Sequence, residues 1–370
     1  MLIMTSFTQL EITVISQLQD YIHQRGFRAL IHFELEGCYQ IPLGKRIDYK
    51  KVNQKLLSLG VDGEVVAEYW SNQWEYVSLF NGQSPLKEAH NLKQALYLLP
   101  KIFATQGVTN TLIKPVVWAG DYGKLALGCE NVFSADNRAV HIPNAVQINV
   151  SVQDLAGNNL LVAGDFAERL QQALLQTSLA CCLLYLPEEE AFERLLLKSK
   201  YGLADELCSP VDISGGHQGS IALHRDIGKH NQKMGMEPVI YDDKNNVIVS
   251  HENWHKTARI EHRLGASSEH YNPYLNVIYT LLNVIDTIDE IKHDQPSAQE
   301  LSNQLPRSLY DQQTEQGAIT LFANNNWFSE SIDRTLNRVQ TDTDMAAELS
   351  IGQQVKQNYL TQFQQPSIII

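Results

Sequence analysis

The stretch Arg259-Ile260-Glu261-His262-Arg263 decides the fold, because its charged and apolar residues alternate one by one. In a strand, residues two apart point to the same side, so Arg259, Glu261 and Arg263 share one face. The even-numbered positions from 258 to 264 face the other side and are apolar except for His262. A helix would spread the three charges around its circumference, so the pattern predicts a strand.

A helix is predicted to begin shortly after this strand, at Asn272-Pro273. Asparagine is a favoured N-cap residue, and proline fits the first helical position because its missing N–H would have no partner there. The apolar residues that follow recur at helical spacing and predict one buried side, made of Leu275, Ile278, Leu281, Leu282, Ile285 and Ile288.

A second strand with paired charges is predicted over residues 27–36, where Glu34 and Glu36 project together and Phe33 and Leu35 lie opposite. Rows of carboxylates and guanidinium groups are costly to bury unless they compensate one another or hold something charged. Divalent cations together with phosphate oxygens would do this. Two simpler interpretations are an exposed strand face for the glutamates and a structural ion network for the arginines.

The rest of the chain predicts a mixture of helices and strands without an internal repeat. We expect helices over 7–25, 85–103, 165–186, 327–339 and 343–363, with Ser84 and Asp165 as N-caps of the second and third. Strands are expected over 112–118, 145–152 and 220–225, and a long loop over 120–143.

Bulk composition excludes several classes of function. The 370 residues carry 42 acidic and 29 basic side chains, a formal charge of -13, which argues against a nucleic-acid surface. The five cysteines include no CxxC pair, so a reduced, cytoplasmic setting is expected. The start has no signal-peptide pattern, and the longest apolar run is too short to span a membrane.

The order of several segments resembles the glutamine synthetase family. RIEHR followed by NPYL resembles the family signature in which an R-I-E-x-R strand precedes an N-P-Y-L helix. The family's other segments have counterparts in the same order, which are HFELEGCYQ (32–40), NQWEYVSLF (72–80), INVSVQDLAGNNLL (148–161) and LPEEEAFERLL (186–196). The resemblance implies an α+β fold with a curved, mainly antiparallel sheet flanked by helices. It implies a catalytic domain over 1–300 and a helical C-terminal extension over 301–370, without the family's N-terminal β-grasp domain.

The resemblance also implies roles for individual residues. One Mg²⁺ or Mn²⁺ ion would be held by Glu36, Glu75 and Glu68, and a second by Glu34 and Glu261, with Gln147 at the position of a histidine ligand. Arg259, and more weakly Arg225, would face the nucleotide phosphates. Arg194, Arg263 and Gln73 would bind a glutamate-like acid. The implied reaction uses ATP to convert the acid into an acyl phosphate, from which an amine displaces phosphate to form an amide.

Departures from the family pattern qualify this interpretation. Gln147 and Asn149 replace the two histidines of the family strand, and HIPNAVQ (141–147) replaces its glycine-rich loop. Of the arginines on the family's phosphate-binding strand, only Arg225 is a candidate, and it is out of register. The missing β-grasp domain supplies the ammonium site in the family, so an amine other than ammonia is expected. A homo-oligomer is possible, but the family's ring does not follow.

Two alternatives remain open at this point. A degenerate homologue would bind a nucleotide, an acidic ligand or a protein partner without catalysis. A zinc hydrolase would use His251 and His255, which lie four residues apart, although the chain contains no HExxH motif.

Overall fold

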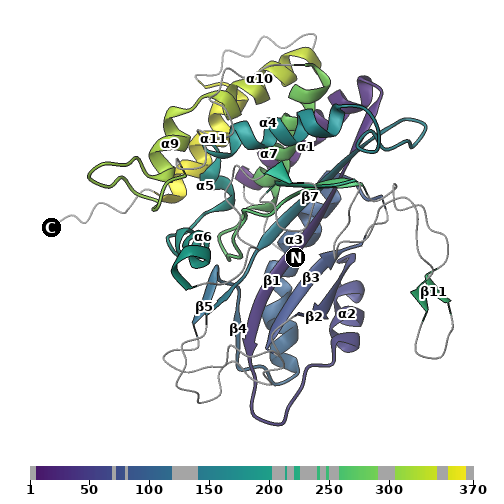
Figure 1. Ribbon diagram of the computed structural model, residues 1–370, viewed down its shortest axis with the longest axis vertical. Coiled ribbons are helices and arrows are strands. Elements are labelled where there is room, and N and C mark those ends of the chain that lie inside the picture. Colours follow the sequence, from purple (N-terminus) through teal and green to yellow (C-terminus); the bar gives the residue numbers. More distant parts are fainter. Residues whose placement is uncertain are drawn as a thin grey trace.

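A mainly antiparallel sheet runs through the molecule and carries most of the residues singled out above (Figure 1). The structure is a computed structural model that describes residues 6–68, 72–79, 82–118, 141–201, 213–214, 221–225, 240–241, 247–249, 258–290, 305–339 and 349–363. The strand order is β2-β3-β1-β7-β12-β9-β8, and β4 pairs with β1. These strands are β1 (Phe27–Gln40), β2 (Gly63–Ala67), β3 (Gln73–Ser78), β4 (Asn110–Leu112), β7 (Val146–Asp154), β8 (Ile213–Ser214), β9 (Ile221–His224) and β12 (Arg259–His262). Two small hairpins pair β5 (Val116–Trp118) with β6 (His141–Pro143), and β10 (Ile240–Tyr241) with β11 (Val247–Val249).

Helices cover one face of this sheet. Contacts with the strands are made by α1 (Ser6–Gln24), α3 (Pro85–Thr105), α4 (Phe166–Ser178) and α7 (Pro273–Ile288). The C-terminal helices α9 (Ala318–Asn324), α10 (Trp327–Val339) and α11 (Ile351–Leu360) form a further layer against α1, α5 (Cys182–Tyr185) and α7 (Figure 1). The remaining elements are α2 (Tyr49–Ser58) beside β2, α6 (Glu190–Tyr201) and the short helix η3 (Thr361–Phe363). None of the described helices is long and apolar enough to cross a membrane.

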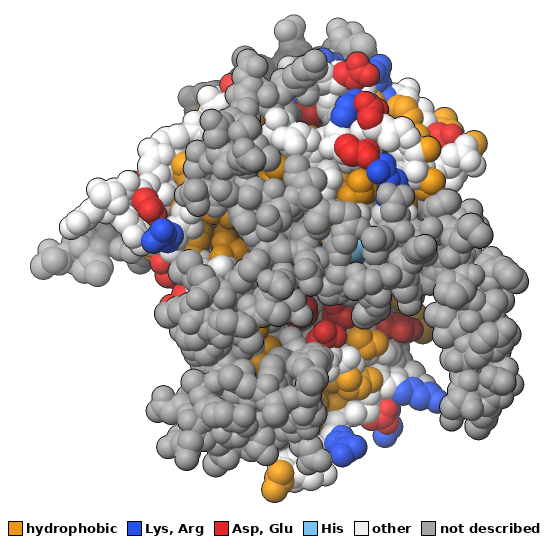
Figure 2. Space-filling model, viewed as in Figure 1, with side chains coloured by type: hydrophobic (Ala, Val, Ile, Leu, Met, Phe, Trp, Pro, Cys, Tyr) orange, Lys and Arg blue, Asp and Glu red, His pale blue; other side chains and the backbone are white. Residues whose placement is uncertain are grey.

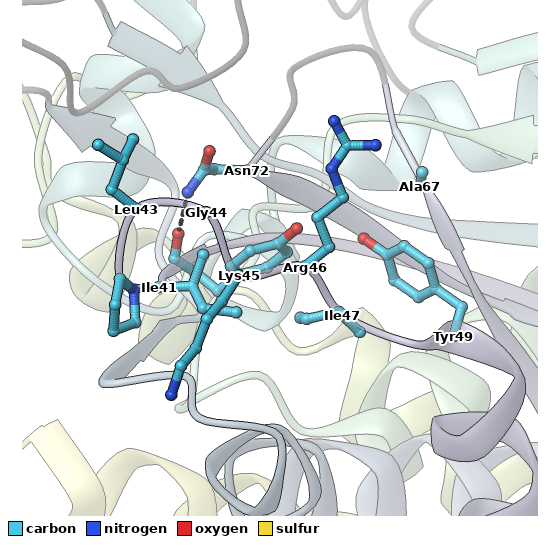
Figure 3. A pocket seen from close by; sticks show the side chains of 11 residues that line it. Ile41, Leu43, Gly44, Lys45, Arg46, Ile47, Tyr49, Ala67 and Asn72 are labelled. Atoms are coloured by element: carbon cyan, nitrogen blue, oxygen red, sulfur yellow. Dashed lines mark hydrogen bonds between the residues drawn. The ribbon is translucent and has the colours of Figure 1, made fainter.

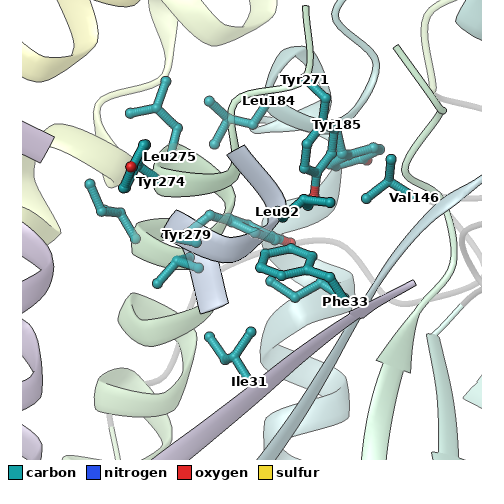
Figure 4. Close-up of a cluster of buried hydrophobic side chains, with 14 of the residues drawn as sticks. Ile31, Phe33, Leu92, Val146, Leu184, Tyr185, Tyr271, Tyr274, Leu275 and Tyr279 are labelled. Atoms are coloured by element: carbon teal, nitrogen blue, oxygen red, sulfur yellow. The ribbon is translucent and has the colours of Figure 1, made fainter. Parts of the chain in front are cut away.

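The core lies between the sheet and these helices (Figure 4). Phe33 of β1 meets Tyr271 edge to face, with ring centroids 6.5 Å apart. The predicted helix at 272–288 is confirmed, and Asn272 caps it by accepting hydrogen bonds from the N–H groups of Tyr274 and Leu275. The helix is buried on nearly every side along most of its length, because α1, α3, α4 and α10 surround it.

Helix α2 closes the outer edge of the sheet at β2. The Asn53 side chain donates to the Val65 C=O at 3.1 Å and accepts from the Val65 N–H at 2.7 Å. One amide side chain therefore satisfies the two backbone groups that a neighbouring strand would otherwise pair with.

Two predicted elements are wrong in their extent. Residues 112–118 are not one strand, because β4 ends at Leu112 and β5 begins at Val116 in a different sheet, with Pro115 between them. The helix expected over 165–186 breaks after Ser178, whose C=O accepts from the Tyr185 hydroxyl at 2.7 Å. Asp165 occupies the predicted N-cap position of this helix, but its side chain makes no capping hydrogen bond.

The other expected elements are largely found. The helix at 85–103 extends to Thr105, with Ser84 as its cap, and the helix at 327–339 has the predicted bounds. For the expected 343–363 helix, α11 and η3 cover 351–363, and residues 340–348 lie outside the described part of the chain. The predicted loop over 120–143 also lies outside it, except for β6 at its end.

A buried aspartate attaches the C-terminal layer to α7. Asp286 accepts from the Trp327 indole N–H at 3.0 Å and pairs with Arg334 at 2.5 Å, both from α10.

The division into domains over 1–300 and 301–370 stays a prediction.

Candidate active site

The sheet has one polar face, and the strand register gathers most of the predicted residues on it. Glu36 lies opposite Glu75, Glu34 opposite Gln147, and Glu261 opposite Asn149. The alternate positions, such as Phe33, Tyr76 and Ile260, face the helices and are buried. The alternation inferred from sequence for β1 and β12 thus places glutamates from distant parts of the chain on one surface.

Acidic side chains occupy one end of this face. Glu36 and Glu75 are cross-strand partners, and the Glu36 carboxylate accepts from the Ala145 N–H at 2.7 Å. The Glu68 N–H bonds to the Gln73 C=O at 3.2 Å, which puts Glu68 on the same side at the end of β2. Figure 2 shows carboxylate-bearing side chains gathered in a recess over β1 to β3. The acidic end is defined here by its five members, which are Glu34, Glu36, Glu68, Glu75 and Gln147.

Gln147 is the member of the acidic end that points to a ligand most directly. Its side chain is 5% exposed, and its Oε1 atom has no hydrogen-bond partner among the described residues. A buried acceptor without a donor is costly, and a hard cation would satisfy it because Mg²⁺ and Mn²⁺ prefer oxygen ligands. The residues present therefore fit a divalent cation.

The opposite end of the face is built around Glu261, which is fully buried. Its Oε1 accepts from Arg263 Nη1 at 3.0 Å, and its Oε2 lies 2.7 Å from His224 Nε2 and 3.6 Å from Arg259 Nη2. Burial by itself raises the pKa of Glu261, but the His224 hydrogen bond and the two guanidinium charges outweigh it and hold the pKa well below its usual range. Arg259, Glu261, Arg263 and His224 are called the arginine end below.

Asn149 joins the two ends. It is fully buried, its Oδ1 accepts from Arg259 Nε at 2.7 Å, and its Nδ2 donates to Glu34 Oε1 at 3.3 Å. The neighbouring His32 lies opposite Asn149, and burial, followed by the Arg259 charge, lowers the pKa of His32 to about 4. His32 is therefore neutral at pH 7 and adds no charge to the face.

Arg194 and Gln73 lie at the margins of the face. Arg194 extends from α6 to the end of β12, where its guanidinium donates to the C=O groups of Leu264 and Arg263 at 3.3 and 3.4 Å. Gln73 is buried beside the acidic end, and its amide donates to Asn144 Oδ1 at 3.1 Å. Their substrate-binding roles stay predictions.

Arg225 is not brought to the face, and its nucleotide-binding role stays a prediction. Its guanidinium pairs with Glu168 of α4 at 2.6 Å, on the helix side of the sheet. The preceding residue, His224, points to the polar face instead and was missed by the sequence analysis. The alternation of β9 would have indicated it, because Ala222 and His224 lie opposite Glu261 and Arg259.

His262 lies on the helix face, as its place among apolar residues predicts. It packs edge to face against Tyr185, with ring centroids 4.8 Å apart, and burial lowers its pKa to about 4. It is therefore a neutral core residue. His251 and His255, the candidates for a zinc site, lie outside the described residues.

Metal binding at the acidic end would need more than carboxylates. Within the described ranges, no three Asp, Glu, His or Cys side chains converge closely enough to hold a metal by themselves. Magnesium in phosphate-binding sites is typically held by one or two carboxylates, substrate oxygens and water. The Glu36–Glu75 pair with the Gln147 oxygen matches that smaller set of ligands, and the arginine end offers charge for anionic oxygens.

A separate cavity of about 540 Å³ opens where β1 ends, next to Ala67 and Asn72 (Figure 3). Asn72 holds its wall by donating to the Tyr39 C=O at 2.9 Å. Lys45 and Arg46 line the cavity but extend in different directions, so they do not form one anion site (Figure 3). None of the described residues that line it is Asp or Glu, which distinguishes it from the acidic end.

Comparison with known proteins by sequence finds no match, since no protein-family model and no curated protein resembles the chain at a significant level.

Solved structures do match. A crystal structure described as a novel glutamine synthase homologue is 15% identical, with a TM-score of 0.54, over 97% of this chain and 72% of its own. A complex of ADP with GmaS, a γ-glutamylmethylamide synthetase, is 10% identical, with a TM-score of 0.57, over 96% of this chain and 75% of its own. GmaS without ligand gives 13% identity, a TM-score of 0.53 and the same coverage. The chain therefore has a glutamine-synthetase-like α+β fold.

Proposed function

We propose that this chain is an ATP-dependent carboxylate–amine ligase that forms an amide through an acyl phosphate. The observation that supports this most is that one sheet face carries a pair of carboxylates, two arginines and a buried amide oxygen that has no hydrogen-bond partner among the described residues. Cations and phosphates bind such sites together, because metal ions bridge phosphate oxygens while arginines hold the remaining charge. The fold shared with GmaS, which was solved with ADP bound, adds to this support.

The same proposal includes the two substrates that are joined, an acid and an amine. A glutamate-like acid would be held by Arg263 and Arg194, with Gln73 at the margin, and the amine would be an organic amine. Mg²⁺ or Mn²⁺ at the acidic end would neutralise charge on the phosphate groups. The chain's own residues would orient the acid so that its carboxylate oxygen attacks the terminal phosphorus of ATP and ADP leaves. The amine nitrogen then attacks the acyl carbon, phosphate leaves, and the proton lost by the amine passes to solvent.

A reducing, cytoplasmic setting is part of the proposal, since the cysteines in the described residues are free and buried. A homo-oligomer is also compatible with it.

The test is release of ADP and phosphate from MgATP with glutamate and a panel of amines. We expect turnover only when acid and amine are both present. Glu75→Gln should lower it by at least about 100-fold, because it removes charge directly at the acidic end. Glu64→Gln, an exposed change on the adjacent strand β2, is the matched control and should leave turnover nearly unchanged. Turnover that survives Glu75→Gln would contradict the proposal.

A catalytically degenerate binding protein is the second candidate. It is favoured by the enclosure of Glu261 and by glutamine and asparagine at positions 147 and 149, where the family resemblance implies histidines. Stabilisation of the fold by MgATP or MnATP, without product from any acid and amine, would favour it over the ligase.

A further inference from the structure

Glu261 is already engaged by three basic side chains of the protein. One carboxylate oxygen accepts from Arg263, and the other lies within 2.7 Å of His224 and 3.6 Å of Arg259. Both His224 and Glu261 are completely buried. A metal ion that displaced His224 from Glu261 would leave the buried imidazole without its partner, which is unfavourable.

The space between Glu34 and Glu261 is also bridged. Asn149 donates to Glu34 and accepts from Arg259, which lies 3.6 Å from Glu261. Asn149 and Arg259 thus lie between the two carboxylates that the family resemblance assigns to a second cation. Gln147, opposite Glu34, by contrast keeps a side-chain oxygen without a donor among the described residues.

The arginine end and the acidic end also differ in charge. At the arginine end, a single described carboxylate faces two positively charged guanidinium groups. A divalent ion beside Glu261 would therefore lie next to two fixed positive charges. The acidic end has four carboxylates and no Lys or Arg among its members, so it attracts a cation.

We propose that the site binds one divalent cation, at the acidic end, and that His224 is a positioning residue that keeps Glu261 engaged with the two arginines in place of a second cation. This inference rests on the proposed ligase function. The arginine end then supplies, from the protein itself, the positive charge for anionic oxygens of the substrates.

The ion count is tested on the purified full-length chain by titration with Mn²⁺ alone. Free Mn²⁺ is measured by electron paramagnetic resonance, because the bound ion loses its sharp solution signal. We expect one bound ion per chain, a loss in affinity of at least about tenfold in Glu75→Gln, and an unchanged count in Glu261→Gln. The number of Mn²⁺ ions bound by the wild-type chain tests the single-cation inference even if Glu261→Gln fails to fold.

Two bound ions, one of them lost in Glu261→Gln, would overturn the single-cation inference and leave the proposed function standing. The absence of any bound ion would overturn both.

The role of His224 is tested with two variants. Glutamine keeps a donor near the position of Nε2, whereas leucine removes it. We expect His224→Leu to raise the KM for ATP about tenfold, with one Mn²⁺ still bound, and His224→Gln to restore the KM to within about threefold of wild type. If the KM for ATP rises equally in both variants and their thermal stability falls equally, the role of His224 is purely structural. That result would overturn the positioning role.

Discussion

Replacement of Glu11 by glutamine should stabilise the protein at high pH. Glu11 lies on α1 with 8% of its surface exposed, and its Oε1 accepts from Asn272 Nδ2 at 2.9 Å. Burial raises its pKa from 4.5 to about 7, although the Asn272 hydrogen bond and the Lys93 charge partly oppose this. Glutamine keeps the acceptor for Asn272 and removes the ionisation.

The sign of the effect follows from the direction of the pKa change. Between pH 4.5 and about 7 the folded chain keeps the Glu11 proton, whereas the unfolded chain has lost it. The free energy of unfolding therefore falls as pH rises through this window and stays lower above it. The difference between 4.5 and about 7, at about 1.4 kcal/mol per pKa unit, gives about 3 kcal/mol.

Urea unfolding followed by circular dichroism at pH 5 and pH 8 measures the effect. Glu11→Gln should gain up to about 3 kcal/mol over wild type at pH 8 and much less at pH 5. Glu88, whose pKa is also raised to about 7 by burial, is present in both proteins, so its contribution cancels. The exposed change Glu64→Gln is the control. An equal difference between Glu11→Gln and wild type at both pH values would refute the reasoning.

Two further changes test the packing that supports the site. Gly37→Ala would place a methyl group 2.4 Å from the Trp74 ring, so we expect a loss of about 1–3 kcal/mol in urea unfolding, and an unchanged midpoint would contradict this contact. Asp286→Asn weakens the bonds to Trp327 and Arg334 that attach α10 to α7, and should cost about 1–3 kcal/mol. If the midpoint temperature of thermal unfolding is the same for Asp286→Asn as for wild type, this attachment contributes little to stability.

Much of the fold was predictable because local signals and tertiary packing agree. Ser84-Pro85 and Asn272-Pro273 mark the starts of α3 and α7 by N-cap chemistry that needs no distant partner. The alternation in β1 and β12 fixes which side chains share a face. By contrast, the break after Ser178 depends on the Tyr185 hydroxyl, and the apolar run from 165 to 186 gives no sign of it.

The candidate site was only partly predictable, because some of its contacts depend on which strands pair. The register brings Glu34, Glu36, Glu75 and Glu261 to one face, as the sequence analysis expected. His224 as a partner of Glu261 could not be predicted, because that contact depends on the pairing of β9 with β12. That pairing selects His224 for the polar face and turns Arg225 toward Glu168.

The Asn53 amide on Val65 has a consequence for the protein at high concentration. Fibrils and other aggregates grow when an extended segment of one molecule adds to an open strand edge of another. At the middle of β2 both backbone groups are already bonded to Asn53, so an incoming segment would have to break two hydrogen bonds before forming its own. A single side chain thus protects this edge from self-templated assembly.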